Sequence, residues 1–365
     1  MLKKAIIAKL STCNWGLSPI VLYLNNMKQL KIPELGKMIV EEAQKPVAGT
    51  GEVLLKIGYV GFCGSDLNTF LGRNLMAKDA VIPGHEIGAT IESIGTGVPE
   101  FLTPGMTVTV NPYTNCDHCA ACRSGHPNAC EFNETLGVQR DGAMRDYIVL
   151  PWQKVIPAPG ITLRNCALIE PMSVGFHAVS RAQVTDSDTV LVFGCGMIGV
   201  GAIVRASLRG ATVIAVDLDN DKLALARRLG AAHTINSKEQ DLHAELAKLT
   251  NNLGPTVVVE AVGSVPTYQA AIDEVAFSGR VVCIGYSKND VTFHTGLFVK
   301  KELNIHGSRN AMPSDFEAVI LYLQRGICPT DELISAVVKP EQALFAMQEW
   351  VAAPGKVFRI LVEFC

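Results

Sequence analysis

The feature that most constrains the fold is an alternation of apolar strands and helical segments between about residues 188 and 284 of the 365-residue chain. The pattern predicts strands at 189–193, 212–216, 256–260 and 280–284, and helices at 198–208, 221–229 and 267–277. Strands that alternate with helices predict a parallel sheet covered on both faces, which is the doubly wound α/β architecture.

The first of these strands runs into the loop Gly194-Cys-Gly196-Met-Ile-Gly199, which opens the next helix. In such a G-x-G-x-x-G loop the glycines permit a tight turn, close approach of a pyrophosphate and close packing of helix on strand. The helix N-terminus favours the phosphates. Asp217 ends the next strand, 23 residues after Gly194, and is expected to accept a hydrogen bond from the adenosine ribose 2′-hydroxyl. Because Asp217 and Asp219 would repel a 2′-phosphate, we predict NAD rather than NADP; the alternative is a glycine-rich turn without a ligand.

The sequence on either side of this region has a different pattern. Short β-rich runs at 37–42, 52–57, 87–94 and 106–110 are separated by turn residues, and after about 303 we predict a helix at 314–324 and a strand at 357–362. A chain of this length predicts about two domains. A strand-like run begins at Met27, so we interpret residues 1–26 as an extension or a mis-assigned start.

The composition excludes several classes of protein. Hydrophobic residues make up 48%, charged residues 18%, and the formal net charge is −3, which is typical of a globular protein and gives no general reason to bind nucleic acid or an anionic membrane. We recognise no convincing signal peptide and no apolar run long enough to span a bilayer. With eleven cysteines, we predict a cytosolic protein whose clustered thiols bind metal rather than form disulfides.

Four cysteines fall in one short segment with the pattern C-x2-C-x2-C-x7-C: Cys116, Cys119, Cys122 and Cys130. Four thiolates fill a tetrahedral zinc and leave no position for a substrate, so the site is predicted to be structural. Neighbouring Asn, Gly and Pro residues indicate a loop rather than a helix, which the metal would order. His118 and His126 are alternative ligands.

A second set of metal-ligand types is scattered along the chain: Cys63, His85 and Glu170. Taken singly, they could be a buried thiol, a core histidine and a capping carboxylate. Together they supply the three side-chain types that zinc accepts, and a catalytic zinc uses three protein ligands and keeps a fourth position open. We therefore predict two zinc ions per chain, one catalytic and one structural.

These motifs resemble those of the zinc-dependent medium-chain dehydrogenase family. The resemblance rests on Cys63-Gly-Ser65-Asp66, Gly84-His85-Glu86, the four-cysteine segment and the dinucleotide loop, and covers the chain from about residue 27 to its end. It implies a GroES-like β-rich catalytic domain formed by 27–172 and 305–365, with a Rossmann-type NAD-binding domain over 173–304 and the catalytic cleft between them. Members commonly form homotetramers or homodimers.

Within that family, Glu170-Pro171 resembles the sorbitol and polyol dehydrogenase branch, and 300–311 is similar to bacterial L-galactonate and related sugar-acid dehydrogenases. The resemblance implies that Ser65 hydrogen-bonds the substrate oxygen and begins a proton relay. Asn68 stands where some members carry the histidine that ends the relay. The implied cofactor contacts are Gly194, Gly196, Met197, Ile198, Gly199, Asp217, Val262 and Gly285.

Three further polar residues receive provisional roles. Asp66 is expected to orient the zinc-bound histidine. Glu86 is expected to approach the metal directly or through water, or to act only through its charge. Arg309 is expected either to fork onto a substrate carboxylate or hydroxyls, or to pair with an acid at the surface.

The predicted activity is zinc- and NAD-dependent oxidation of a secondary alcohol of a polyol, a sugar or a sugar acid such as L-galactonate. Zinc would act as a Lewis acid on the alcohol oxygen. Dehydrogenases of the threonine or butanediol type are alternatives within this class. Outside it, the alternatives are a non-enzymatic zinc-binding interaction module with a basic face and a zinc-free quinone reductase relative.

Overall fold

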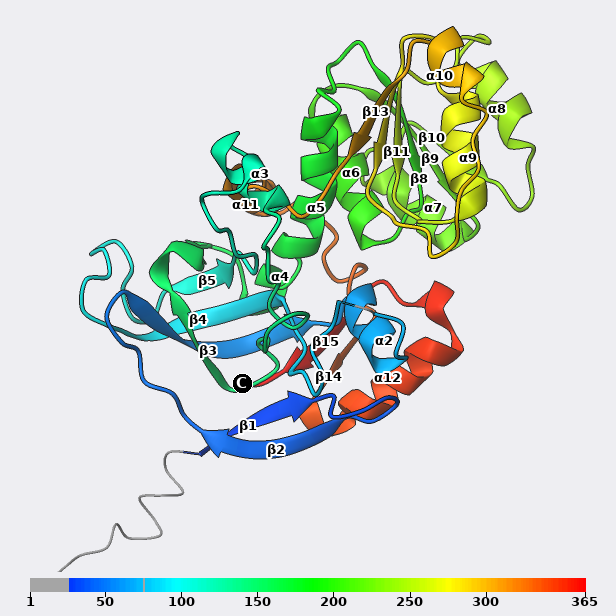
Figure 1. Ribbon diagram of the computed structural model, residues 1–365. Coiled ribbons are helices and arrows are strands. Elements are labelled where there is room, and N and C mark those ends of the chain that lie inside the picture. Colours follow the sequence, from blue (N-terminus) through cyan, green and yellow to red (C-terminus); the bar gives the residue numbers. More distant parts are fainter. Residues whose placement is uncertain (1–25, 75) are drawn as a thin grey trace, which may run out of the picture.

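The computed structural model describes residues 26–74 and 76–365, which form three β-sheets with helices packed around them (Figure 1). The extension predicted over 1–26 lies outside the described residues except for Asn26, the first residue of β1. No helix among the described residues is long and apolar enough to cross a membrane.

The strands are β1 (Asn26–Lys31), β2 (Ile39–Gln44), β3 (Glu52–Gly61), β4 (Glu86–Ile94), β5 (Thr107–Val110), β6 (Tyr147–Pro151), β7 (Val155–Pro157), β8 (Thr189–Phe193), β9 (Thr212–Asp217), β10 (His233–Asn236), β11 (Val257–Glu260), β12 (Arg280–Cys283), β13 (Asn304–Gly307), β14 (Ala336–Val338) and β15 (Ile360–Glu363).

The α-helices are α2 (Gly64–Phe70), α3 (Ala120–Arg123), α4 (Leu163–Cys166), α5 (Ile169–Arg181), α6 (Met197–Leu208), α7 (Asn220–Arg228), α8 (Leu242–Leu249), α9 (Val265–Glu274), α10 (Gly296–Lys300), α11 (Pro313–Leu323) and α12 (Ala343–Ala352). Short 3-10 turns cover Pro127–Ala129, Trp152–Lys154, Pro340–Gln342 and Pro354–Lys356.

The dinucleotide half is a six-stranded parallel sheet in the order β10-β9-β8-β11-β12-β13. Its central strands are apolar and buried almost throughout, because helices cover both faces. The predicted doubly wound fold is confirmed. The third helix is shorter than predicted: α9 ends at Glu274, since Val275 is extended and Ser278 takes a positive φ of 54° in the turn before β12.

The other half is a seven-stranded, mainly antiparallel sheet with the path β14-β15-β3-β4-β5-β7 and β6 paired to β3. Strand β15, near the chain's end, pairs with β3, and α12 contributes Met347 and Trp350 to the same core as Phe62 and Ile87. The β-rich fold therefore begins before the parallel sheet and resumes after it. The last strand starts at Ile360, three residues later than predicted, after the 3-10 turn Pro354–Lys356.

Helix α5 connects the two halves (Figure 1). It packs closely against α6 because two glycines lie at the crossing: a Cβ on Gly175 would lie 2.2 Å from the Ile198 carbonyl oxygen, and one on Gly201 would lie 2.5 Å from that of Met172. The predicted domain boundary at 172/173 falls inside α5, and the one at 304 falls on the first residue of β13.

Candidate active site and metal centres

A cleft of about 780 Å³ lies between the two halves. The β-rich half contributes the start of α2 and the segment around α12, including Cys63, Ser65, Asn68, Trp350 and Arg359. The dinucleotide half contributes the glycine loop and the residues after β11 and β12: Gly196, Met197, Ile198, Gly199, Val262, Gly285 and Lys288 among them. Ser65 and most of the predicted cofactor residues therefore line one cavity, whereas Gly194 and Asp217 are not among its lining residues.

Cys63, His85 and Glu86 form a cluster at the base of this cleft, with one ligand atom from each lying within 4.8 Å of the others. Cys63 is the N-cap of α2, and His85 follows Gly84, whose φ of +102° turns the chain into β4. Burial acts against the Cys63 thiolate, but His85 and Arg359 lower the pKa of this thiol to about 7. His85 is buried, and its Nδ1 has no hydrogen-bond partner among the described residues. These buried donors suit a zinc ion.

Glu86 is fully buried, in a space that exists because residue 61 is glycine: a Cβ there would lie 2.2 Å from Glu86 Oε2. The Arg359 guanidinium lies 3.1 Å from Glu86 Oε1, but at an angle that makes no hydrogen bond. Both carboxylate oxygens thus lack a donor among the described residues. Burial raises the pKa of Glu86 well above its usual range, although Arg359 acts in the opposite direction. A metal cation would satisfy these oxygens.

Glu170, the third predicted ligand, lies at the start of α5 and is buried close enough for its charge to influence His85. The cluster defined by the 4.8 Å separation does not include it. Instead, Tyr113 donates its hydroxyl hydrogen to Glu170 Oε1, and both side chains are buried. Two carboxyl groups therefore lie near Cys63 and His85: Glu86 is ion-paired with Arg359, and Glu170 is hydrogen-bonded by Tyr113. Neither Arg359 nor Tyr113 belongs to a sequence motif, so neither was predicted.

The two predicted neighbours of the metal lie on the first turn of α2. Asp66 is fully buried, and its Oδ2 accepts a hydrogen bond from the backbone amide of Cys63 at 2.8 Å. This hydrogen bond fixes the backbone of the cysteine, and the role of Asp66 in orienting His85 stays a prediction. Ser65 faces the cleft, and its Oγ has no hydrogen-bond partner within the described residues.

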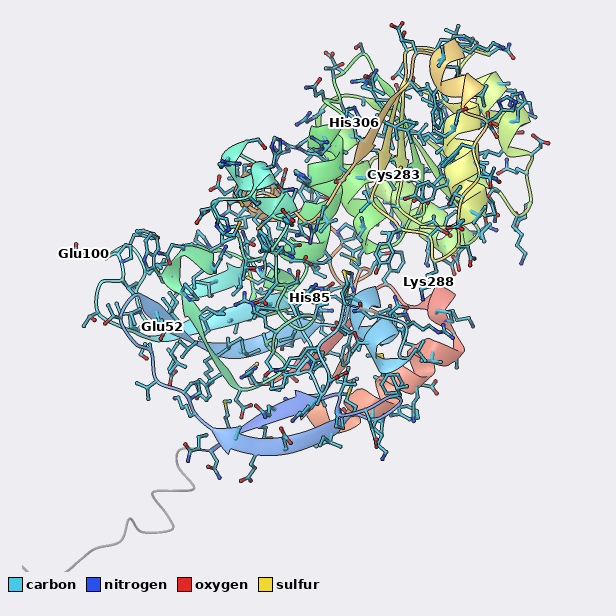
Figure 2. All side chains as sticks on the ribbon, in the orientation of Figure 1. Glu52, His85, Glu100, Cys283, Lys288 and His306 are labelled. Carbon is cyan, nitrogen blue, oxygen red and sulfur yellow. The ribbon has the colours of Figure 1, made fainter. Side chains whose placement is uncertain are left out.

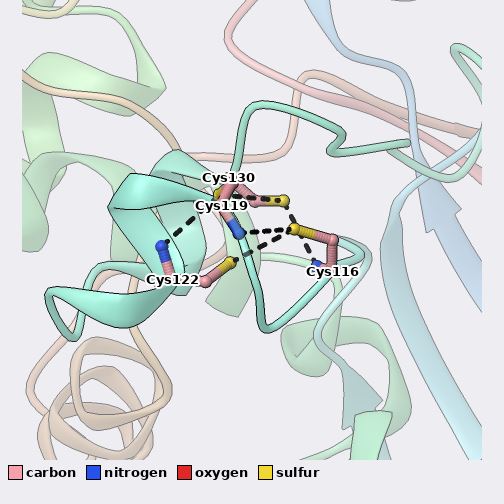
Figure 3. Close-up of side chains that lie close together, drawn as sticks. All are labelled: Cys116, Cys119, Cys122 and Cys130. Atoms are coloured by element: carbon pink, nitrogen blue, oxygen red, sulfur yellow. Dashed lines mark hydrogen bonds between the residues drawn. The ribbon is translucent and has the colours of Figure 1, made fainter.

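The four-cysteine segment brings its sulfur atoms together at a separate site (Figure 3). The Sγ atoms of Cys116 and Cys122 lie 4.0 Å apart, and those of Cys119 and Cys130 lie 3.9 Å apart. These distances are too long for disulfides and close to the edge of about 3.8 Å expected for a tetrahedral zinc–thiolate site. One expectation is corrected: the segment is not purely a loop, because Cys119 caps the one-turn helix α3, which contains Cys122.

The glycine loop has the geometry of a dinucleotide site. Gly194 has a φ of +89°, and a Cβ on Gly199 would lie 1.8 Å from the Gly194 carbonyl oxygen. A Cβ on Gly196 would meet no atom within 4 Å, so this position faces the open cleft. Asp217 Oδ2 accepts a hydrogen bond of 2.7 Å from the Cys195 amide and so braces the loop. The loop thus fits a pyrophosphate, and Asp217 retains acceptor capacity for a ribose hydroxyl.

Arg309 does not line the cleft. Its Nη1 donates to the Cys130 carbonyl oxygen at 3.1 Å, beside a separate cavity of about 300 Å³ that His177 and Arg181 also line. In this structure the arginine therefore supports the four-cysteine segment and lies away from Ser65 and the glycine loop.

A cleft between a GroES-like half and a dinucleotide half, with one metal cluster at its base and another in a side loop, defines a zinc-binding dehydrogenase. Models of two families match the chain: the alcohol dehydrogenase GroES-like domain over residues 49–160 and the zinc-binding dehydrogenase over residues 198–325. The chain belongs to the zinc-type medium-chain alcohol dehydrogenase family and is an oxidoreductase.

Two similar proteins are named as dehydrogenases of a sugar acid and of a polyol. L-galactonate-5-dehydrogenase of Escherichia coli K12 is 32% identical over 313 residues, 86% of this chain and 92% of that protein. Sorbitol dehydrogenase of Bacillus subtilis 168 is 31% identical over 347 residues, 92% of this chain and 97% of that protein. Among solved structures, an alcohol dehydrogenase from Escherichia coli CFT073 complexed with NADH superposes with a TM-score of 0.86 at 28% identity, covering 93% of this chain and 100% of that one.

Proposed function

We propose that this protein oxidises a secondary alcohol of a polyol, a sugar or a sugar acid to the ketone, with NAD as the hydride acceptor. The observation that carries the proposal is the buried cluster of Cys63, His85 and Glu86, which opens into the same cleft as the glycine loop. A metal centre and a dinucleotide site in one cavity can act on one substrate carbon.

Cys63 and His85 would hold a catalytic zinc, with Glu170 or Glu86 as the third ligand. When bound, the zinc supplies Lewis acidity and the nicotinamide supplies the hydride acceptor. Ser65 lines the cleft one residue after the start of α2, where its free hydroxyl can accept a hydrogen bond from the substrate alcohol. Trp350 and Phe358 contribute apolar surface to the wall of the cleft.

The preference for NAD over NADP is proposed from Asp217 and Asp219. Asp217 Oδ1 already accepts hydrogen bonds from the amides of Leu218 and Asp219, which fixes its carboxylate at the end of β9. A 2′-phosphate placed there would meet this fixed negative charge. Cytosolic location and homo-oligomeric assembly stay predictions.

The direct test is a screen of NAD and NADP reduction with polyols, aldonates such as galactonate, threonine and butanediol, combined with metal analysis of the same sample. The proposal expects NAD-linked turnover with a polyol or aldonate and about two zinc ions per chain. Turnover with only threonine or butanediol would show that the protein is a threonine-type or butanediol-type dehydrogenase instead. Zinc without redox activity would favour the interaction module, and activity without zinc would favour the quinone reductase reading.

A further inference from the structure

The cleft has an unbalanced positive charge. Among the described residues that line it, the only charged side chains are Lys288 and Arg359, and no aspartate or glutamate is present. Arg359 is buried and paired with Glu86. Lys288 is exposed, makes no ion pair with any described residue, and donates one hydrogen bond of 2.9 Å to the neutral amide oxygen of Asn68. An ammonium has three donors, so two remain available for a ligand.

The position of Lys288 relative to the sheet places it away from the cofactor phosphates. Asp217 ends β9 and marks the adenosine side, the glycine loop follows β8, and Lys288 lies in the segment after β12. The strand order β9-β8-β11-β12 separates β8 from β12 by two strand spacings, about 10 Å. A dinucleotide with its pyrophosphate at the glycine loop would therefore direct its nicotinamide end toward Lys288.

Lys288 also lies near the proposed reaction centre of the other half. Its partner Asn68 is three residues after Ser65 on α2, so the two side chains share one face of the helix and are about 4.5 Å apart along its axis. Both line the cleft. In Figure 2, Lys288 lies where the dinucleotide half approaches α2. The ammonium thus binds a residue that lies about one helical turn from the serine assigned to the alcohol oxygen.

We propose that Lys288 is a specificity-determining residue that binds an anionic group on the substrate, a carboxylate or a phosphate several bonds away from the carbinol carbon. This inference rests on the proposed dehydrogenase function and narrows its substrate class to sugar acids and polyol phosphates. It gives Lys288 the role that the sequence had suggested for Arg309, which lies outside the cleft. Asn68 holds the ammonium through a neutral oxygen and so leaves its charge available to the substrate.

The spacing on α2 between Ser65 and Asn68, the partner of Lys288, requires a substrate whose anionic group is well separated from its carbinol carbon. In a short 2-hydroxy acid such as lactate, the carboxylate is attached to the carbinol carbon itself and cannot reach one helical turn away. An aldonate oxidised near its far end, or a polyol phosphate, carries its charge at the required separation. Lys288 should therefore discriminate between long anionic substrates and neutral polyols, and should not affect lactate.

The test compares wild type with Lys288→Gln on galactonate, galactitol 1-phosphate, neutral galactitol and lactate, and measures KM for NAD in each case. Lys300→Gln, in the exposed helix α10 outside the cleft, is the matched control. The ratio of kcat/KM for the anionic substrate to that for galactitol should fall about tenfold in Lys288→Gln, as expected for a lost charge-assisted hydrogen bond. The control should keep the wild-type ratio. A fall in this ratio with galactonate indicates that Lys288 binds a carboxylate, and a fall with galactitol 1-phosphate indicates that it binds a phosphate.

An unchanged ratio in both anionic arms would overturn the inference while leaving the dehydrogenase function intact. A loss shared by all substrates together with a raised KM for NAD would also overturn it, because Lys288 would then contact the cofactor. If wild type oxidises none of these alcohols and no polyol or aldonate of the wider screen, the proposed function fails separately. In that case, calorimetric titration of galactonate into the NAD-loaded proteins tests whether Lys288 binds an anion. Weaker binding by Lys288→Gln than by wild type supports the anion site, and equal binding excludes it.

Discussion

At the scale of single residues, the proposed active site has two buried carboxyl groups near Cys63 and His85. Glu86 is adjacent to Arg359, and Glu170 accepts a hydrogen bond from Tyr113. Both arrangements place a carboxyl group near the proposed metal position, but only Glu86 belongs to the cluster of atoms within 4.8 Å. Residues that orient metal ligands commonly change metal affinity when they are replaced. Tyr113 is therefore expected to be a positioning residue for Glu170.

Replacing Tyr113 with Phe tests this role. The variant keeps the ring that packs on Phe316 and removes only the hydroxyl, so the core should stay intact. If Glu170 ligates the catalytic zinc, zinc affinity at that site should fall about tenfold, while the second zinc is retained. Competition with a chelator measures both affinities. Glu170→Gln should weaken the same site further, and a site weakened by Glu86→Gln but unaffected by Tyr113→Phe and Glu170→Gln would assign the ligand to Glu86.

The chemistry-bearing residues differ in how far the sequence could identify them. The four cysteines and the glycine loop have local spacings with a physical meaning, and both assemble as predicted into a thiol cluster and a strand–turn–helix. Tyr113, Arg359 and Lys288 stand alone in the sequence, without a pattern. Each of them contacts a segment far away in the sequence, and a local sequence pattern cannot predict such a contact. Arg309 had been selected from a segment resemblance, and its position depends on how 305–312 packs against the four-cysteine segment.

At the scale of elements, polar groups join segments that the sequence separates. Asn128, in the four-cysteine segment, donates to His177 Nε2 on α5, and His177 Nδ1 lies 2.8 Å from an oxygen of Asp315 at the start of α11. Since Glu170 lies on the same helix as His177, α5 links the structural metal segment to the catalytic cleft. Helix and strand types followed from hydrophobic periodicity, whereas these cross-connections depend on tertiary packing.

A second polar group joins the amino ends of three parallel strands. The buried carboxylate of Asp188 accepts hydrogen bonds from the Thr185 amide at 2.8 Å and the Thr256 hydroxyl at 2.7 Å, and it pairs with Arg280. Burial raises the pKa of Asp188, but these partners together lower it below its usual value. A carboxyl group whose pKa is lower in the folded state stabilises the fold above its unfolded pKa of about 3.9 and loses that contribution as the pH falls through the folded value.

Replacing Asp188 with Asn should therefore lower the free energy of unfolding by about 1–3 kcal/mol at pH 7. The difference between wild type and variant should begin to shrink below about pH 4, where the carboxyl group of the unfolded chain starts to be protonated, and should disappear as the pH falls through the lower pKa of the folded state. Urea unfolding in matched buffers measures both values. Because Asp188 lies at the opposite end of the strands from the cleft, kcat/KM should be close to that of wild type. A difference in stability that persists unchanged at low pH would show that the ionised carboxylate is not its cause.

At the scale of the whole molecule, the β-rich half is formed by distant parts of the chain, with β15 pairing with β3 and the parallel sheet inserted between them. This arrangement encloses the cleft between two separately folded sheets, with the metal cluster on one wall and the glycine loop on the other. The sequence alone indicates a β-rich pattern that stops before the parallel sheet and resumes after it. Only the family resemblance implied that the C-terminal strands complete the same sheet as the N-terminal ones, because pairing between strands so far apart in the sequence leaves no local signal.

We propose that the two zinc sites have different roles, one catalytic and one structural. The most direct measurement is zinc content, NAD-linked turnover and unfolding midpoint for Cys63→Ser and Cys119→Ser alongside wild type. Cys63→Ser should retain about one zinc per chain and a near wild-type unfolding midpoint, and it should lose turnover. Cys119→Ser should also lose about one zinc per chain, but its main effect should be a lower unfolding midpoint than that of wild type. Full turnover in Cys63→Ser, or a loss of stability confined to that variant, would contradict the account.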